Sequence, residues 1–258
     1  MRNVRLIALR ELQSYFVSPL AYIILMMFMF IVGWFFLGVL FAYSEYSMQA
    51  AMNPGMAEHL TVHDVIIRTL FSTFGVILIF LAPLLSMRVF ADEKRQGTAE
   101  LMLTAPVSTV QLVLGKYFGT LGFGAVLLGS TLAFPAYLLA IGAPVDAGPL
   151  AAVYLGTFLM LGAFLSVGVF SSALTANPVA SAGIAFVTCL FFWVVGFLGD
   201  IGGGAGEYGR FLKSLSITER YEDFLKGVVD TGAVVYYLTF IAFGLFLTGR
   251  VIDSSRWR

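Results

Sequence analysis

The chain has 258 residues, of which 59% are hydrophobic and 12% are charged. Soluble domains average about 45–50% apolar and about 25% charged residues, so this composition excludes an ordinary soluble domain. Fifteen basic residues balance 15 acidic ones, and no overall charge is left to attract nucleic acid.

The first 16 residues predict an amphipathic helix that lies in the membrane interface. Apolar residues between Val4 and Leu12 alternate with basic ones in a helical rhythm. Charges recur too often for a cleaved signal peptide. Two roles stay open for this helix: a basic anchor that sets membrane topology, and a contact surface for a partner protein.

Six apolar runs are long enough to span a membrane. Crossing about 30 Å of hydrocarbon takes about 20 residues of helix. The predicted spans are 20–43, 65–87, 117–141, 149–171, 178–198 and 233–249. Asn177 before Pro178, and Ser108 three residues before Gln111, are typical helix starts. The predicted fold class is an all-α polytopic membrane protein with one transmembrane domain, 1–258.

Residues 44–64 form a predicted external segment with two histidines, His59 and His63. Their i, i+4 spacing places them on one helix face. Position 60 is Leu, so the HExxH zinc motif is absent, and a lone pair in a polar loop is usually solvated. Metal binding is therefore the less favoured interpretation.

Residues 88–116 form a predicted cytoplasmic loop with the most informative pattern in the chain. A charged stretch, 92–95, precedes Gly97, which can end a helix, and Thr98 can cap a second short helix that Pro106 stops. The apolar residues 101–103 of that helix need a surface to pack against. An ordinary charged hairpin is the alternative.

Residues 199–232 form a second external segment, in which apolar residues recur at near-helical spacing from Phe211 to Val228. This predicts an amphipathic helix that caps or dips into the outer face, because its charges are too frequent for a span. In the third span, Gly115 and Gly119 form a GxxxG pattern. Close helix packing is its usual meaning, with a dimer seam as the alternative.

The distribution of Lys and Arg predicts that both termini are cytoplasmic. Six spans put both termini on one side, and basic residues in short flanks are retained in the cytoplasm. Ten basic residues fall on the side of the termini: Arg2, Arg5, Arg10, Arg88, Lys94, Arg95, Lys116, Arg250, Arg256 and Arg258. Five fall opposite: Arg68, Arg210, Lys213, Arg220 and Lys226.

The sequence shows no catalytic motif and no ion pathway. The predicted spans carry essentially no ionisable groups, which disfavours an ion-coupled carrier. The motifs GxSxG, HExxH and GxxxxGK[ST] are absent, and the single cysteine, Cys189, argues against a cysteine metal cluster. The chain is predicted to be non-catalytic and to bind no cofactor, so energy for any work must come from a partner.

The central segment resembles the signature of ABC-2-type permeases. The residues that carry this resemblance are Phe90, Glu93, Lys94, Arg95, Gly97, Thr98, Glu100, Leu101, Pro106 and Gly115-Lys116, together with Arg10-Glu11-Leu12 near the N-terminus. The resemblance covers most of the chain and is greatest for the gliding-motility-associated branch.

The resemblance implies a permease subunit of an ATP-driven exporter in the bacterial inner membrane. The interfacial helix and a short cytoplasmic coupling helix would dock on a separate ATP-binding subunit, present in two copies and holding ATP and Mg. A second permease chain, identical or homologous, completes the path, and some members of the branch act with accessory membrane or periplasmic subunits. The implied docking residues are Arg5, Arg10, Glu11, Glu93, Arg95, Gly97, Thr98, Glu100, Leu101 and Met102.

A second hypothesis keeps the same complex but moves no cargo. In that case the chain is an ATP-regulated envelope scaffold or mechanotransmission subunit. An ion-coupled carrier or membrane enzyme is a third class, disfavoured by the missing intramembrane ionisable groups.

Overall fold

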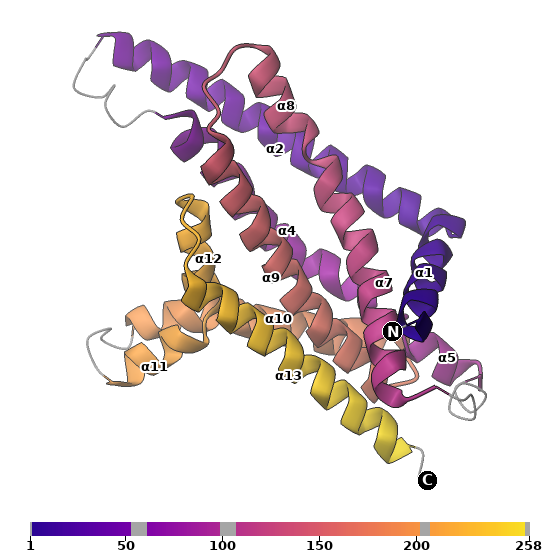
Figure 1. The fold of residues 1–258 in the computed structure, drawn as a ribbon. Coiled ribbons are helices and arrows are strands. Elements are labelled where there is room, and N and C mark those ends of the chain that lie inside the picture. The colour runs from indigo at the N-terminus through magenta and orange to yellow at the C-terminus, as the bar shows by residue number, and fades with distance from the viewer. Residues whose placement is uncertain (1, 53–60, 99–106, 202–206, 256–258) are drawn as a thin grey trace.

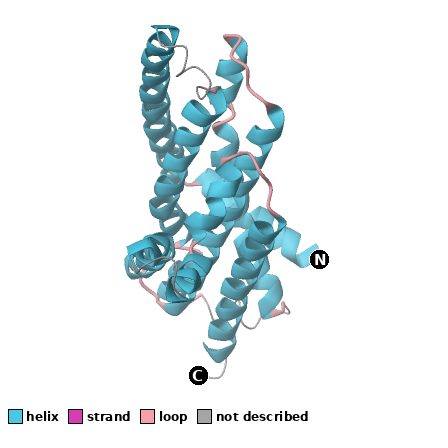
Figure 2. Cartoon of the chain, turned by 90° about the vertical axis from the view of Figure 1, so that its left-hand side faces the viewer, coloured by secondary structure: helices cyan, strands magenta, loops and turns pink. Residues whose placement is uncertain are grey.

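The computed structural model describes residues 2–52, 61–98, 107–201 and 207–255, and its regular elements in these ranges are helices (Figures 1 and 2). Helices satisfy every backbone hydrogen bond within one segment, which hydrocarbon requires. In chain order they are α1 (Arg2–Val17), α2 (Pro19–Met52), η1 (His63–Ile67), α4 (Arg68–Ser86), α5 (Ala91–Arg95), α7 (Thr109–Ser130), α8 (Ala133–Ala140), α9 (Ala147–Leu174), α10 (Pro178–Ile201), α11 (Glu207–Leu215), α12 (Ile217–Leu225) and α13 (Thr231–Ser255).

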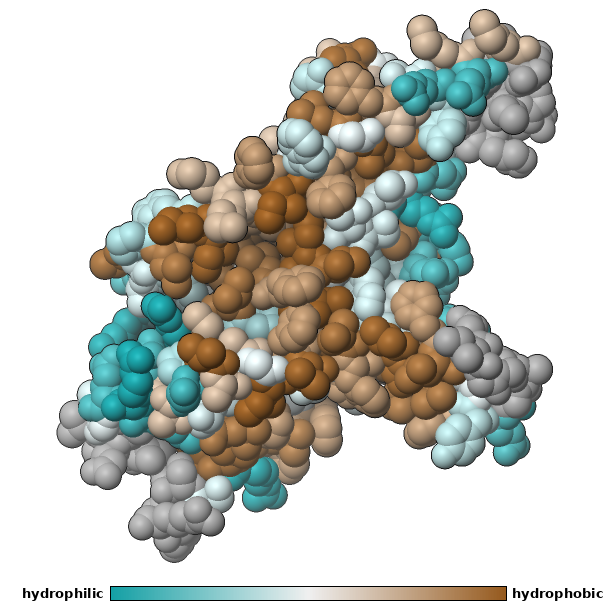
Figure 3. Space-filling model, turned by 180° about the vertical axis from the view of Figure 1, so that it is seen from behind, coloured by the Kyte–Doolittle hydropathy of each residue, from teal (hydrophilic) through white to brown (hydrophobic). Residues whose placement is uncertain are grey.

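Six helical segments are long and apolar enough to cross a membrane, which confirms the predicted number of spans. They are Pro19–Gln49, His63–Arg95, Thr109–Ala140, Ala147–Leu174, Pro178–Gly199 and Thr231–Ser254. Figure 3 shows apolar side chains over much of one face, with polar side chains gathered toward its edges. The protein is therefore a multi-pass membrane protein. Figure 1 places both termini and α5 at the same end of the bundle, as an even number of spans requires.

Two helix starts follow the predicted capping residues. The Ser108 hydroxyl accepts the N–H of Gln111 at 3.3 Å, and the Asn177 side chain accepts the N–H of Val179 at 2.9 Å. The first of these caps changes a boundary, because α7 begins at Thr109 and not at Tyr117. The predicted loop 88–116 is correspondingly shorter, and Lys116 lies inside a span.

Helix α9 forms the centre of the bundle. In the most apolar 18-residue stretch of α9, 67% of the residues are buried. The corresponding share is 17% for α2, which lies at the periphery. Helices α4, α10, α12 and α13 all pack on α9. Glycines permit these close approaches: a Cβ at Gly156 would lie 2.4 Å from Phe224 of α12. The packing of the spans is thus organised around one helix with small residues on its surface.

The segment before the last span contains two short helices, α11 and α12, where the sequence predicted an amphipathic helix. Tyr221 of α12 is buried and its hydroxyl lies 3.0 Å from the carbonyl of Phe71 and 2.8 Å from the hydroxyl of Thr157. Burial raises the pKa of Tyr221, so its hydroxyl stays protonated and can donate. Helix α12 is therefore fixed to α4 and α9.

His63 lies near the same helix, with Nε2 3.1 Å from the carbonyl of Leu225. The other histidine of the predicted pair, His59, lies outside the described residues. Within the described ranges, no group of three or more His, Cys, Asp or Glu side chains could hold a metal ion. The contact of His63 is accordingly a link between η1 and α12.

The close approach of α12 to α9 gives a test of this packing. We expect Gly156→Ala to destabilise the protein by about 1–3 kcal/mol, because the new methyl group overlaps Phe224. Gly148→Ala is the matched control in the same helix, since a Cβ there meets nothing within 4 Å. Thermal unfolding in detergent measures both variants, and equal melting temperatures would contradict this packing.

Candidate functional site: the Lys116 cluster

Helix α1 lies against the glycine face of α7. A Cβ at Gly115 would lie 2.6 Å from Ile7, and one at Gly119 would lie 2.5 Å from Glu11 and 2.8 Å from the carbonyl of Ala8. The backbones of the two helices can meet this closely only because glycine has no side chain. The GxxxG pattern is therefore used for packing within the chain, at positions that α1 already covers.

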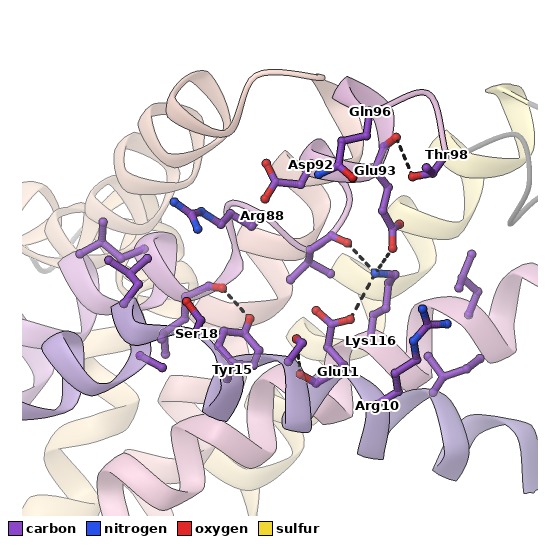
Figure 4. Close-up of a pocket in the computed structure, with 18 of the residues that line it drawn as sticks. Arg10, Glu11, Tyr15, Ser18, Arg88, Asp92, Glu93, Gln96, Thr98 and Lys116 are labelled. Carbon is purple, nitrogen blue, oxygen red and sulfur yellow. Dashed lines mark hydrogen bonds and ion pairs between the residues drawn. The ribbon is translucent and has the colours of Figure 1, made fainter.

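This contact places Glu11 beside Lys116, whose side chain is only 4% exposed. The Lys116 ammonium lies 3.3 Å from Glu11 Oε2 and 2.7 Å from Glu93 Oε1. It also donates to the carbonyl of Val89 at 2.7 Å and lies 5.2 Å from the centre of the Phe90 ring. We call these five residues the Lys116 cluster, and Figure 4 shows Lys116 with its partners Glu11 and Glu93.

The cluster compensates a buried charge with groups from several parts of the chain. An ammonium removed from water needs an ion pair and hydrogen bonds for all its protons. Glu11 comes from α1, Glu93 from α5, and Val89 and Phe90 from the turn between α4 and α5. Lys116 itself lies about two turns into α7. One side chain thus joins α1, α7, α5 and the end of α4.

Tyr15 adds a second link between α1 and α4. Its hydroxyl donates to the carbonyl of Leu85 at 2.7 Å and lies 3.3 Å from Thr120, while its ring stacks on Phe123 at 4.9 Å. Burial, and then the charge of Glu11, raise the pKa of Tyr15. The hydroxyl therefore remains protonated and keeps donating.

Helix α5 is also anchored to the central helix. The Ser172 hydroxyl of α9 accepts the N–H groups of Phe90 at 2.9 Å and Ala91 at 3.0 Å, and it donates to the carbonyl of Met87 at 3.1 Å. The Lys94 ammonium donates to the carbonyl of Ala173, near the C-terminus of α9, where the helix dipole favours a cation. The turn before α5 is therefore held by α9.

The end of α5 follows the predicted stop at Gly97. Its φ is +70°, and its N–H donates to the carbonyl of Lys94 at 3.3 Å while the N–H of Thr98 donates to that of Glu93 at 3.1 Å. This pairing is a Schellman motif. The Thr98 hydroxyl also lies 3.3 Å from the Glu93 carbonyl. The helix predicted to follow Thr98 lies outside the described residues.

A cleft of about 820 Å³ opens beside the cluster. One wall comes from α1 and the first turns of α2, and the other comes from the end of α4, α5 and α7. Figure 4 shows Arg88, Ser18 and Tyr15 toward one side of the cleft, and Arg10 toward the side of Lys116. Polar groups thus line its α1–α5 end.

The structure brings some of the predicted docking residues together and separates others. Arg10, Glu11, Glu93 and Thr98 line the cleft, whereas Arg5, Arg95 and Gly97 do not. Glu11 and Glu93 are paired with Lys116 inside the chain. The exposed residues of this group are Arg5, Arg10, Arg95 and Gly97. Glu100, Leu101 and Met102 lie outside the described residues, so their predicted docking role stays a prediction.

The sequence analysis missed Lys116 and Ser172 as site residues. Lys116 was placed in the loop, although a lysine beside glycine in an apolar helix is a signal for a buried ion pair. Ser172 gives no such signal, because a serine near the end of a span usually bonds to its own helix.

A comparison with protein-family models gives a match to the ABC-2 family transporter proteins over residues 6–252. The chain belongs to this family. A search among curated proteins gave no significant match. Members of this family are membrane components of ABC transporters, which are generally not catalytic themselves and generally partner with an ATP-binding subunit.

Replacing the lysine of this ABC-2 protein tests the cluster. We expect Lys116→Met to destabilise the protein by about 3–5 kcal/mol, because two carboxylates are left facing each other in a partly buried site. Lys226→Met is the matched control, since its pairs with Glu222 and Asp223 are half exposed and worth under about 1 kcal/mol.

Denaturant unfolding in detergent measures both lysine variants. Adding Glu11→Gln and Glu93→Gln to Lys116→Met should recover part of the loss, because the unpaired carboxylates are then neutral. A loss no larger than that of Lys226→Met would show that the cluster does not hold these helices together.

The glycine face of α7 gives an independent test of the α1 contact. We expect Gly119→Ala to speed amide hydrogen exchange across residues 2–17 at least about tenfold, since α1 must move away from the added methyl group. Gly129→Ala, in the same helix with nothing within 4 Å, should leave exchange there unchanged. Unchanged exchange in both variants would contradict the α1–α7 packing.

Proposed function

We propose that this ABC-2 protein is the permease subunit of an ATP-driven exporter and that the end of the bundle bearing α1 and α5 docks a separate ATP-binding subunit. Two copies of that subunit hold ATP and Mg²⁺, and a second permease chain completes the transport path. The family match supports the permease role. The contacts of α5 with the spans support docking at this end, because a docked partner can move the spans only through a rigid element that contacts them.

The observation that carries the proposal is that α5 is joined to four helices at once. Glu93 reaches α7 and α1 through Lys116, while the turn before α5 continues from α4 and is held by Ser172 of α9. A partner that displaces α5 therefore pulls on the ends of several spans together. Such a rigid-body shift is a common way to transmit a conformational change.

The surface offered to the partner combines charged and uncovered groups. Arg95 is 63% exposed, and Gln96 and Gly97 beside it are exposed as well. Arg5 and Arg10 lie exposed on α1 at the same end of the bundle. Charged groups at the rim of an interface orient the partner, and apolar residues such as Leu101 and Met102 would supply burial.

The proposed location is the bacterial inner membrane with both termini in the cytoplasm. The ten basic residues predicted on that side support this orientation. Both termini and α5 lie at one end of the bundle, which agrees with it. We also expect the chain to fall in the gliding-motility-associated branch, which the residues 90–106 and 115–116 suggest.

Capture of the partner tests the docking end. We expect tagged protein from mildly solubilised membranes to recover a P-loop ATPase, and Glu100→Ala with Leu101→Ala to reduce recovery at least about tenfold, as loss of a central interface contact does. The control is Glu222→Ala with Asp223→Ala, which removes two carboxylates from α12 in the predicted external segment.

Equal recovery with both double variants would show that the ATPase docks elsewhere, and recovery of the chain alone would contradict the subunit role.

Transport of cargo is tested in a separate experiment. An exporter reconstituted with its ATPase in vesicles moves cargo when ATP is added, whereas ATP hydrolysis without movement of any cargo would favour the envelope scaffold.

A further inference from the structure

We propose that the exposed arginines around the start of α7 receive an acidic surface of the ATP-binding subunit. These arginines lie at the end of the bundle that bears α1 and α5, which we call the docking end. The inference rests on the proposed function and deepens it, because it names the chemistry that the partner must present there. It is carried by the charges that the docking end exposes and by those that it engages internally.

The docking end exposes positive charge and no negative charge among the residues that the structure describes there. Its exposed charged side chains are Arg2, Arg5, Arg10, Arg88, Arg95 and Arg250. The opposite end has the reverse balance in the described ranges. Its exposed carboxylates are Glu45, Asp64, Asp146, Glu207, Glu219 and Glu222, and its exposed basic residues are Arg210 and Lys226. A chain with no net charge therefore carries a positive surface at one end.

The carboxylates of the docking end are engaged within the chain and only partly exposed. Those that the structure describes are Glu11, Asp92, Glu93 and Asp253. The two glutamates belong to the Lys116 cluster. Asp92 lies 3.6 Å from Arg95, which remains 63% exposed, and the Asp253 carboxylate accepts the Thr109 hydroxyl at 2.5 Å. The arginines are thus left without an exposed negative neighbour in the described part of this end.

Two helices bring their arginines to the first turn of α7. Helix α1 meets it where the Asn3 side chain donates to Gln111 at 3.4 Å, so the start of α1 and its first arginines lie level with that turn. Helix α13 meets it through Asp253, and Arg250 lies three residues before this contact, about one turn away. Both helices therefore place guanidinium groups beside the same helix start.

Helix α5 completes the set on a third side of α7. Its Glu93 reaches Lys116, about two turns into α7, and Arg95 follows two residues later. Axes of packed helices lie about 8–10 Å apart, so arginines on helices that all touch α7 surround one helix end. A protein surface contacts such an array with separate carboxylates, and no two arginines need to share one anion.

Membrane insertion alone does not account for this surface. Basic residues are retained in the cytoplasm whether or not carboxylates accompany them, because Asp and Glu contribute little to topology. Engaging the carboxylates internally therefore brings no gain in insertion. It does give an acidic partner a positive surface without repulsion, and such complementarity speeds and orients association.

The position of α5 favours a protein over anionic lipid headgroups. Helix α4 has 19 residues and is about 28 Å long, close to the thickness of the hydrocarbon, about 30 Å. Arg95 comes nine residues after the end of α4 at Ser86, on the helix that follows the next turn. It is therefore placed beyond the span, on the side where the ATP-binding subunit docks.

Association of the purified full chain with the ATPase recovered by capture tests the charge of the partner. In nanodiscs of phosphatidylcholine, which has no net charge, we expect the association rate constant to fall at least about tenfold between about 50 mM and about 500 mM NaCl, because salt screens the attraction. Arg5→Gln with Arg250→Gln should lower the rate constant at low salt at least about threefold, although neither residue lies in the loop 88–116. Arg210→Gln with Lys226→Gln is the matched control, since it removes two exposed charges from the opposite end.

The outcomes separate this inference from the proposed function. A rate constant that is equal at both salt concentrations would overturn the inference and leave docking of the ATPase intact. A salt effect that appears only in phosphatidylglycerol nanodiscs would also overturn it, because the arginines would then bind anionic lipid. Absence of binding even at low salt would contradict the proposed function, and the inference with it.

Arginine footprinting tests the unaltered complex. Phenylglyoxal modifies exposed guanidinium groups, and mass spectrometry locates the modified residues. We expect modification of Arg95 and Arg250 to slow at least about fivefold when the ATPase is bound, because its acidic surface covers them. Arg210, which is exposed at the opposite end, should react at the same rate in both states. Equal rates at Arg95 and Arg250 with and without the ATPase would overturn the inference.

Discussion

The buried ammonium of Lys116 is the constraint on which the α1–α5 end of the molecule depends. A charge so far from water is tolerated only if carboxylates and carbonyls surround it, and here they come from other segments: Glu11 from α1, Glu93 from α5 and the Val89 carbonyl from the turn before α5. Glu11 requires α1 to lie close to α7, which Gly115 and Gly119 permit. Glu93 requires α5 to turn back over the bundle, which Ser172 and Lys94 secure from the side of α9. The buried lysine, the glycine face of α7 and the anchoring of α5 therefore depend on one another.

A consequence is that α5 is not a free loop on the surface. Its start is bonded to Ser172, its end is closed by Gly97 in a left-handed conformation, and its carboxylate Glu93 is held by Lys116. An element with three such attachments transmits displacement instead of absorbing it, because moving it breaks buried polar contacts that are costly to leave unpaired. Tyr15 extends the connection, since it fastens α1 to the Leu85 carbonyl at the end of α4. The spans that a partner would move are thus α4, α7 and α9.

The sequence was sufficient for what depends on local chemistry and insufficient for what depends on contact between distant segments. Hydropathy predicted six spans, and short-range capping chemistry predicted the helix starts at Ser108 and Asn177. The same Ser108 marked the start of α7, but the charge at Lys116 suggested a loop, because the carboxylates that neutralise it are 105 and 23 residues away along the chain, as 116 − 11 and 116 − 93 show. The GxxxG pattern predicted close packing without naming α1 as the partner. Burial of Tyr221 against Thr157 likewise required the folded chain.

The polar groups of the spans also indicate whether a proton or ion gradient could drive conformational change in this protein. Among the buried residues that the structure describes, Lys116 is the charged one, and the other polar members are Ser and Thr, many of which bond to carbonyls of their own helices. A proton or ion path needs a succession of ionisable groups along the spans, and a lysine paired with two carboxylates near one end does not provide it. The same lysine is well placed for mechanical work, because it links the helix ends where an ATP-driven partner would act. An ABC-2 protein whose buried charge lies at one end, with hydroxyl groups along the spans, is suited to receive motion from outside the membrane.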